Sequence, residues 1–169
     1  MYLAIRRATE ADAQAVLKVT KESFSLYQED LHVTYEVKAL KETLESTLYD
    51  ITHNAVFVVE KFGELVGAIR IKKLSDKLWY IYRFGVSPGI TNTGLGSSLL
   101  DAAVTFAHEN GAKAIALHTN SKYYRLARYY YGKQFYVHST AFDRGYVRAL
   151  FILELDGEQS VDLSPAFLE

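Results

Sequence analysis

The chain has 169 residues, of which 49% are hydrophobic and 23% charged, an average balance for a globular protein. Nineteen basic and twenty acidic residues give a formal charge of −1, so no basic field is expected to hold a nucleic acid. There is no cysteine, which excludes disulfides, thiolate metal ligands and a cysteine nucleophile.

The apolar stretches are only as long as strands, so no membrane partner is expected. Residues 1–7 hold no apolar core of signal-peptide length, and a cytoplasmic location is the default expectation. No metal is expected either, because the histidines show no ligand spacing; they are His32, His53, His108, His118 and His138.

The first third of the chain predicts one strand and two helices. A short strand is predicted at residues 3–6, and Thr9 with Asp12 has the pattern of a helix cap. A second helix is predicted over residues 34–49. Its apolar face is Val37, Leu40, Leu44 and Leu48. Its opposite face, expected to be solvated, is Lys38, Lys41, Glu42 and Glu45.

The middle of the chain changes to the period of strands. Residues 55–60 and 65–71 predict a hairpin around the turn 61–64, and residues 78–86 predict a third strand. A helix then begins at Gly94 and ends before Gly111, where a positive φ is wanted. The strand at 114–119 follows this helix, which predicts a parallel right-handed crossover.

The last third predicts a helix over 121–133 and closing strands at 135–140 and 146–155. The order β-α-α-β-β-β-α-β-α-β-β predicts one α/β (α+β) domain over residues 1–169. Its central sheet is expected to be mixed but mostly antiparallel, with helices flanking it.

The most informative segment joins the third strand of the meander to the helix after it. Two alternating glycines, Gly94 and Gly96, lie where the helix begins, and the first amides of a helix have no partner inside it. Such a corner suits a phosphate or pyrophosphate. A tight turn without a ligand explains the glycine pair about as well.

A second glycine feature favours coenzyme A over a dinucleotide. Gly85 lies within a bulky strand, where it indicates a bulge or a close backbone approach. Backbone exposed there can pair with an extended amide-bearing ligand such as pantetheine. A dinucleotide site needs an early βαβ unit and an acidic residue after its next strand, which this order does not supply.

The segment resembles the coenzyme A motif of the GNAT superfamily of N-acetyltransferases, Gln/Arg-x-x-Gly-x-Gly/Ala. Thr91 stands where that family prefers Gln or Arg, which predicts weakened affinity rather than its loss. Val86 and Pro88 match the family's strand-ending Val-x-Pro. The resemblance implies acetyl-CoA as donor. The residues it implies as contacts are Phe84, Gly85, Val86, Thr91, Asn92, Thr93, Gly94, Leu95, Gly96 and Ser97.

A run rich in tyrosine, residues 123–135, resembles the family's second signature, Asn-x-x-Ala-x-x-Leu-Tyr-x-x-x-Gly-Phe. The resemblance places Tyr130 on the tyrosine that donates a proton to the departing thiolate. In the alternative reading Tyr130 belongs to the buried stripe of a helix. The other tyrosines of the helix, expected to pack or to line a pocket, are Tyr124, Tyr129 and Tyr131.

The residues do not assign a general base. Many members of the family carry a Glu on the strand that ends at Val86, but here that position is Tyr80. The alternatives are His118, Glu60, or a chain of water molecules without a dedicated base.

The resemblance implies direct acetyl transfer to a primary amine, in a small molecule or a peptide. A non-catalytic sensor of coenzyme A with the same fold is the alternative that the missing carboxylate favours. The identity of the amine, the use of longer acyl groups and the choice between a monomer and a homodimer stay open.

Overall fold

A computed structural model describes residues 3–157 and 160–169. The chain forms two compact units. The first comprises the chain up to Lys72 together with Tyr82–Phe106, and the second comprises Lys73–Ile81 and Ala107–Glu169. The strand β4 (Leu78–Val86) therefore begins in the second unit and ends in the first.

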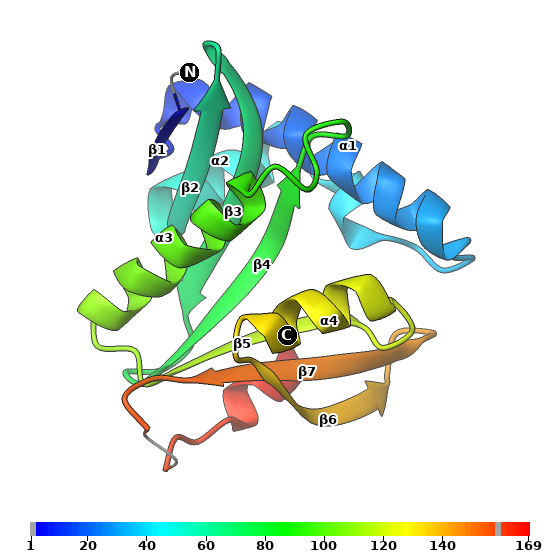
Figure 1. Ribbon diagram of the computed structural model, residues 1–169, viewed down its shortest axis with the longest axis vertical. Coiled ribbons are helices and arrows are strands. Elements are labelled where there is room, and N and C mark those ends of the chain that lie inside the picture. Colours follow the sequence, from blue (N-terminus) through cyan, green and yellow to red (C-terminus); the bar gives the residue numbers. More distant parts are fainter. Residues whose placement is uncertain (1–2, 158–159) are drawn as a thin grey trace. The chain divides into compact units, whose positions relative to one another are not determined.

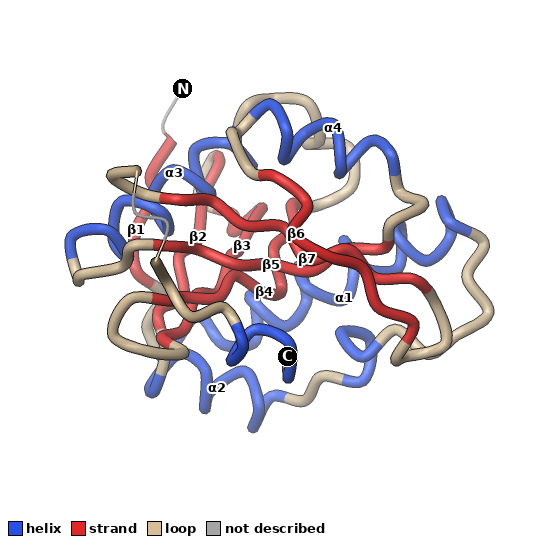
Figure 2. Tube along the Cα trace, turned by 90° about the horizontal axis from the view of Figure 1, so that it is seen from below, coloured by secondary structure: helices blue, strands red, loops and turns tan. Residues whose placement is uncertain are grey.

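The first unit is built on β1 (Leu3–Arg7), β2 (Ala55–Lys61), β3 (Glu64–Lys73) and the end of β4, neighbours in that order. Both β1 and β3 run antiparallel to β2. The helices α1 (Ala13–Leu31) and α2 (Leu44–His53) cover one face of these strands, and α3 (Leu95–Glu109) covers the other (Figures 1 and 2).

The predicted cap sets the start of the first helical segment. The Thr9 N–H donates to the Asp12 carboxylate at 2.7 Å, just before a 3₁₀ turn, Glu10–Asp12, and α1. Val16 of α1 then packs in a core cluster with Ile51 of α2 and Val58 of β2. The spacing of apolar residues along α1 thus decides which of its faces the strands cover.

The second helix differs from its prediction over 34–49. A 3₁₀ turn, Lys38–Lys41, ends at Glu42, whose ψ of 143° is not helical, and α2 begins afresh at Leu44. Thr43 caps the new helix by accepting from the Ser46 N–H at 3.1 Å. The face predicted to be solvated is also partly wrong, because the Glu42 side chain is only 8% exposed.

The second unit contains the start of β4, then β5 (Ala114–Asn120), β7 (Val147–Glu154) and β6 (Tyr136–Phe142), neighbours in that order. The β4–β5 pair is parallel, as the crossover predicted, while β5–β7 and β6–β7 are antiparallel. Figures 1 and 2 show α4 (Tyr124–Gly132) on one face of these strands and the 3₁₀ helix η3 (Ser164–Leu168) on the other.

The predicted order of helices and strands is confirmed, and the sheet is mixed and mostly antiparallel. Gly111 ends α3 with a φ of 96°, as its position predicted. η3 is an addition that the sequence pattern did not indicate. Within residues 3–157 and 160–169, no helix has both the length and the apolarity that crossing a membrane requires.

Candidate functional site

The end of β4 is irregular, and the irregularity falls on Arg83. This residue has a φ of +50°, which is uncommon for any residue other than glycine. Two residues later, α1 crosses the strand at Gly85. A Cβ atom at Gly85 would lie 2.2 Å from the Ser23 hydroxyl oxygen, so only glycine fits there. The close approach predicted for Gly85 is therefore confirmed, with Ser23 as the neighbour.

After β4 the chain makes a tight loop before α3. The Ser87 N–H donates to the Val66 carbonyl of β3 at 2.8 Å, which holds the loop's first residue against the strand. The Thr93 hydroxyl donates to the Ile90 carbonyl at 2.6 Å and closes the loop on itself. Asn92 turns the chain with a φ of +64°.

The two glycines of the motif differ in what they do. Gly94 has a φ of +83°, so its freedom from a Cβ serves the backbone turn. Gly96 would place a Cβ 3.6 Å from the Phe84 ring, an ordinary contact that the fold tolerates. Nothing within the chain therefore requires glycine at position 96. A ligand passing close to the helix start would require it.

The start of α3 is a suitable site for an anion. The Ser98 N–H bonds back to the Gly94 carbonyl at 3.1 Å, so the helix ladder begins there. The amides of Leu95 and Gly96 lie before it, in the turn where no intrahelical carbonyl is available. The helix dipole adds partial positive charge at the same place.

A third glycine fixes α3 on the strands. A Cβ at Gly67 of β3 would come within 2.9 Å of side-chain atoms of Leu99, Val59 and Val86. Glycine there lets α3 lie close to β3, and Leu99 is fully buried at this contact. The anion-binding end of α3 is thus anchored directly beside the end of β4.

The structure brings the predicted coenzyme A residues together within the first unit. Four of them form the exposed loop, and Leu95 is buried at the start of α3. The exposed four are Thr91, Asn92, Thr93 and Gly94. Sequence analysis missed Ser23 and Arg83. A charged residue in an otherwise apolar strand was the available signal for Arg83.

Tyr130, the predicted proton donor, lies in the second unit, in an aromatic cluster of α4. Its side chain is 5% exposed and packs against Tyr129, Phe135 and Phe151, with ring centroids 5.3–5.6 Å apart. Burial raises the pKa of Tyr130 far above its ordinary value, so the phenol stays protonated at neutral pH. Its hydroxyl makes no hydrogen bond with the described residues.

The other tyrosines of α4 only partly match the packing predicted for them. Tyr129 packs against Tyr130, and Tyr131 meets the Phe151 ring at 5.7 Å. Tyr124 instead is 68% exposed.

Tyr80 and His118, the residues raised in the search for a base, form a hydrogen-bonded pair in the second unit. The Tyr80 hydroxyl lies 2.7 Å from His118 Nδ1. Burial, helped by the charges of Arg148 and Arg144, lowers the pKa of His118 to about 4. His118 is therefore neutral at pH 7, and it is a weak proton acceptor.

Glu60, the third candidate, lies in the first unit and is held by a cation. Arg6 of β1 donates to its carboxylate from Nε at 3.1 Å and also from Nη2. Arg6 also bonds Asp12 at 2.7 and 2.9 Å. The Glu60 carboxylate thus belongs to a surface ion cluster that ties β1 to β2.

A family model described as the acetyltransferase (GNAT) family matches residues 20–135, more than half of the chain. The chain belongs to the GNAT family of acetyltransferases. The resemblance of the loop and of α4 to this family is thereby confirmed, and so is the predicted class of enzyme, an acyltransferase.

Relatives of this GNAT protein extend over most of its length. It is 29% identical over 143 residues to the uncharacterized N-acetyltransferase YhfO of Bacillus subtilis, covering 82% of this chain and 92% of that one. Among solved structures, the PaiA N-acetyltransferase of Thermoplasma acidophilum in complex with coenzyme A superposes with a TM-score of 0.79. It is 18% identical, with 92% of this chain and 100% of that chain covered.

A second solved structure is YncA, a putative acetyltransferase of Salmonella typhimurium determined with acetyl-CoA. It superposes with a TM-score of 0.76 at 18% identity, covering 96% of this chain and 99% of that one. At these identities the two structures show a shared fold.

Proposed function

We propose that this GNAT protein transfers an acetyl group from acetyl-CoA to a primary amine by direct attack. The observation that carries the proposal is the corner at the start of α3. Gly94 turns the chain with positive φ, the amides of Leu95 and Gly96 begin the helix, and position 96 has no internal need for glycine. A pyrophosphate fits this corner. The complexes of PaiA with coenzyme A and of YncA with acetyl-CoA support the choice of donor.

In the proposed site, the pyrophosphate lies on the loop and first turn, residues 91–97. The pantetheine arm pairs with the backbone of Phe84 and Val86 at the end of β4. The Val86 amide is the proposed donor to the acetyl carbonyl oxygen, where negative charge develops during attack. A preorganised donor at such an oxygen contributes about 3 kcal/mol in known cases.

The transfer itself makes one C–N bond and breaks one C–S bond. The neutral amine attacks the thioester carbonyl, and the sulfur leaves as the thiolate of coenzyme A. Tyr130 is the proposed proton donor to that sulfur, since its buried phenol is protonated at neutral pH. The proton lost by the amine goes to water, because His118 is a weak acceptor and Glu60 is held by Arg6.

The weakness of His118 as a base also supports a second candidate, a sensor that binds coenzyme A without turnover. Two measurements separate the candidates. Calorimetry with coenzyme A measures binding, and thiol release from acetyl-CoA in the presence of an amine panel measures transfer. The proposed enzyme binds coenzyme A and releases thiol only when an amine is present. Binding without amine-dependent release identifies the sensor, and no binding contradicts both.

A further inference from the structure

The last hairpin of the second unit carries two arginines that converge on one main-chain oxygen. Arg148 of β7 donates from Nη1 to the Glu169 carbonyl oxygen at 3.2 Å, and Arg144, in the preceding turn, donates from Nη2 to the same atom. A guanidinium matches a carboxylate better than it matches a neutral carbonyl. The carbonyl of Glu169 therefore stands where a carboxylate oxygen fits.

Arg148 is fixed in this orientation by its other edge. Its Nε and Nη2 donate to the two carboxylate oxygens of Asp143 at 2.9 and 2.8 Å, a bidentate pair. The Arg148 side chain is 4% exposed. Asp143 balances one positive charge, while Arg148 and Arg144 contribute two. The paired arginines thus form a rigid cationic site rather than two mobile surface chains.

The cationic site lies beside the pair formed by Tyr80 and His118. After burial, the charges of Arg148 and Arg144 are the next largest causes of the lowered pKa of His118. Both arginines also act on Tyr80. Tyr80 occupies the strand position at which the family resemblance places a proton acceptor for the amine. The arginines are therefore close to where the proposed function expects the acceptor.

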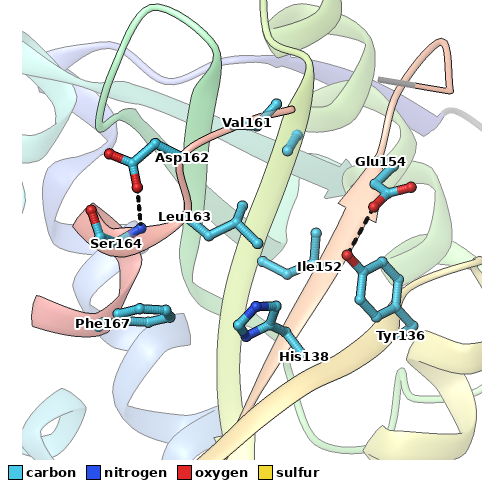
Figure 3. A pocket seen from close by; sticks show the side chains of 10 residues that line it. Tyr136, His138, Ile152, Glu154, Val161, Asp162, Leu163, Ser164 and Phe167 are labelled. Carbon is cyan, nitrogen blue, oxygen red and sulfur yellow. Dashed lines mark hydrogen bonds between the residues drawn. The ribbon is translucent and has the colours of Figure 1, made fainter. Parts of the chain in front are cut away.

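The segment that carries Glu169 has little apolar anchoring. In η3 the buried residue is Ala166, while Phe167 is half exposed and meets the His138 ring at 5.8 Å. Leu168 is 86% exposed. An open hollow of about 420 Å³ remains between this segment and the strands β6 and β7 (Figure 3). The contacts to the arginines are thus a large share of what seats the segment.

We propose that Arg144 and Arg148 bind a carboxylate of the acceptor, and that the segment around Glu169 competes for the same site. The acceptor class is then a primary amine that also carries a carboxylate, as an amino acid does. This inference rests on the proposed function for its catalytic meaning. It deepens that function by naming the acceptor class and an internal competitor.

Binding is tested without any acetyl transfer, on the full chain. The probes are N-acetylglycine, which has the carboxylate, and N-acetylglycinamide, its neutral match. NMR titration follows the ring protons of His118 and the amides of Phe167 and Leu168. N-acetylglycine is expected to shift both sets with one saturable curve. The amide probe is expected to bind at least about tenfold more weakly, since it lacks the charge.

Variants separate the subsite from the competing segment. Arg144→Gln is expected to weaken N-acetylglycine by about tenfold and leave the amide probe unchanged. Ala166→Asp, which places a charge at a fully buried position, should unseat η3 and tighten N-acetylglycine binding several-fold. Leu168→Asp adds the same charge at an exposed position of the same helix and should change little. If Ala166→Asp does not fold, Arg144→Gln alone decides on the subsite.

Equal binding of the two probes would overturn the proposal, as would unchanged affinity in Arg144→Gln. Unchanged affinity in folded Ala166→Asp would refute the competition. Failure of the proposed function has a different appearance. In that case N-acetylglycine still binds selectively, but no amine causes thiol release from acetyl-CoA. If thiol release occurs with glycine and glycinamide at equal kcat/KM, transfer stands and the carboxylate subsite does not.

Discussion

Glu42 holds Arg83, the residue of β4 with positive φ, through an ion pair of 3.2 Å between Arg83 Nε and Glu42 Oε2. The other oxygen of the same carboxylate accepts from Arg70 Nη1 at 2.7 Å. Arg70 is fully buried and also bonds Asp50 at 2.6 Å. One carboxylate thus joins β3 and β4 just before the strand end that we propose to bind pantetheine.

Removing the charge of Glu42 should therefore destabilise the first unit. Glu42→Gln leaves Arg70 buried with one carboxylate fewer, and breaking a buried ion pair costs about 3 kcal/mol or more. Urea unfolding measures the change. Glu45→Gln is the matched control, because Glu45 is exposed in the same stretch of chain and should change stability by less than about 0.5 kcal/mol. Similar losses in the two variants would show that the Glu42 ion pairs contribute little.

The contact between Gly85 and Ser23 predicts a rescue. In Gly85→Ala the new Cβ meets the Ser23 Oγ and Cβ, which should cost about 1–3 kcal/mol of stability. Ser23→Gly removes both clashing atoms, at about 1 kcal/mol for glycine in a helix. The double variant should lose clearly less than the sum of the two single losses. A double-mutant cycle in urea measures this coupling, and strict additivity would contradict the contact.

Gly94 tests the proposed phosphate site. Gly94→Asp should raise the KM for acetyl-CoA by about tenfold or more, because the carboxylate repels the pyrophosphate. Gly94→Asn is the control for backbone strain, since Asn tolerates the same φ of +83° without the charge. Steady-state kinetics on both variants separate charge from strain. The phosphate site would be wrong if Asp and Asn raised the KM equally.

Gly96→Ala tests the same corner from the steric side. Its Cβ has only an ordinary contact with the Phe84 ring, so thermal stability should stay unchanged. The KM for acetyl-CoA should still rise, because the methyl group lies where a ligand would approach the helix start. Loss of stability without a change in KM would place the constraint inside the protein.

Tyr130→Phe should keep the ring and the aromatic cluster, so the thermal midpoint should change little. Turnover should fall by about 10²-fold with a nearly constant KM for acetyl-CoA, the pattern of an interaction made mainly in the transition state. Tyr129→Phe, on the neighbouring ring, is the control. Equal losses of turnover in the two variants would defeat the assignment, and normal turnover would mean that the thiolate leaves unaided.

His118 predicts how stability depends on pH. Its pKa is about 4 in the folded protein against an ordinary 6.5, so below pH 6.5 the unfolded chain binds a proton that the folded chain does not. Stability should therefore be fully present above pH 6.5 and fall as pH decreases towards 4. His118→Asn, which keeps an acceptor for the Tyr80 hydroxyl, should flatten this part of the profile. Thermal midpoints measured from pH 4 to 7 provide the test, and superimposable profiles would contradict it.

The order of elements and the loop at the start of α3 were both predictable from the sequence. Both are encoded locally: the period of apolar residues separates helix from strand, and glycines with Pro88 mark where the chain turns. The cap at Thr9 and the turn at Gly111 were predicted for the same reason, since each depends on residues within one helical turn.

What depends on distant residues was decided only by the tertiary structure. Glu42 looked solvated because its neighbours along the chain are polar, yet Arg70 and Arg83 reach it from two strands. Gly85 indicated a close approach, but only the packing of α1 names Ser23 as the partner. The pair of arginines facing Glu169 joins residues 21 and 25 positions apart, a distance over which no local pattern carries information.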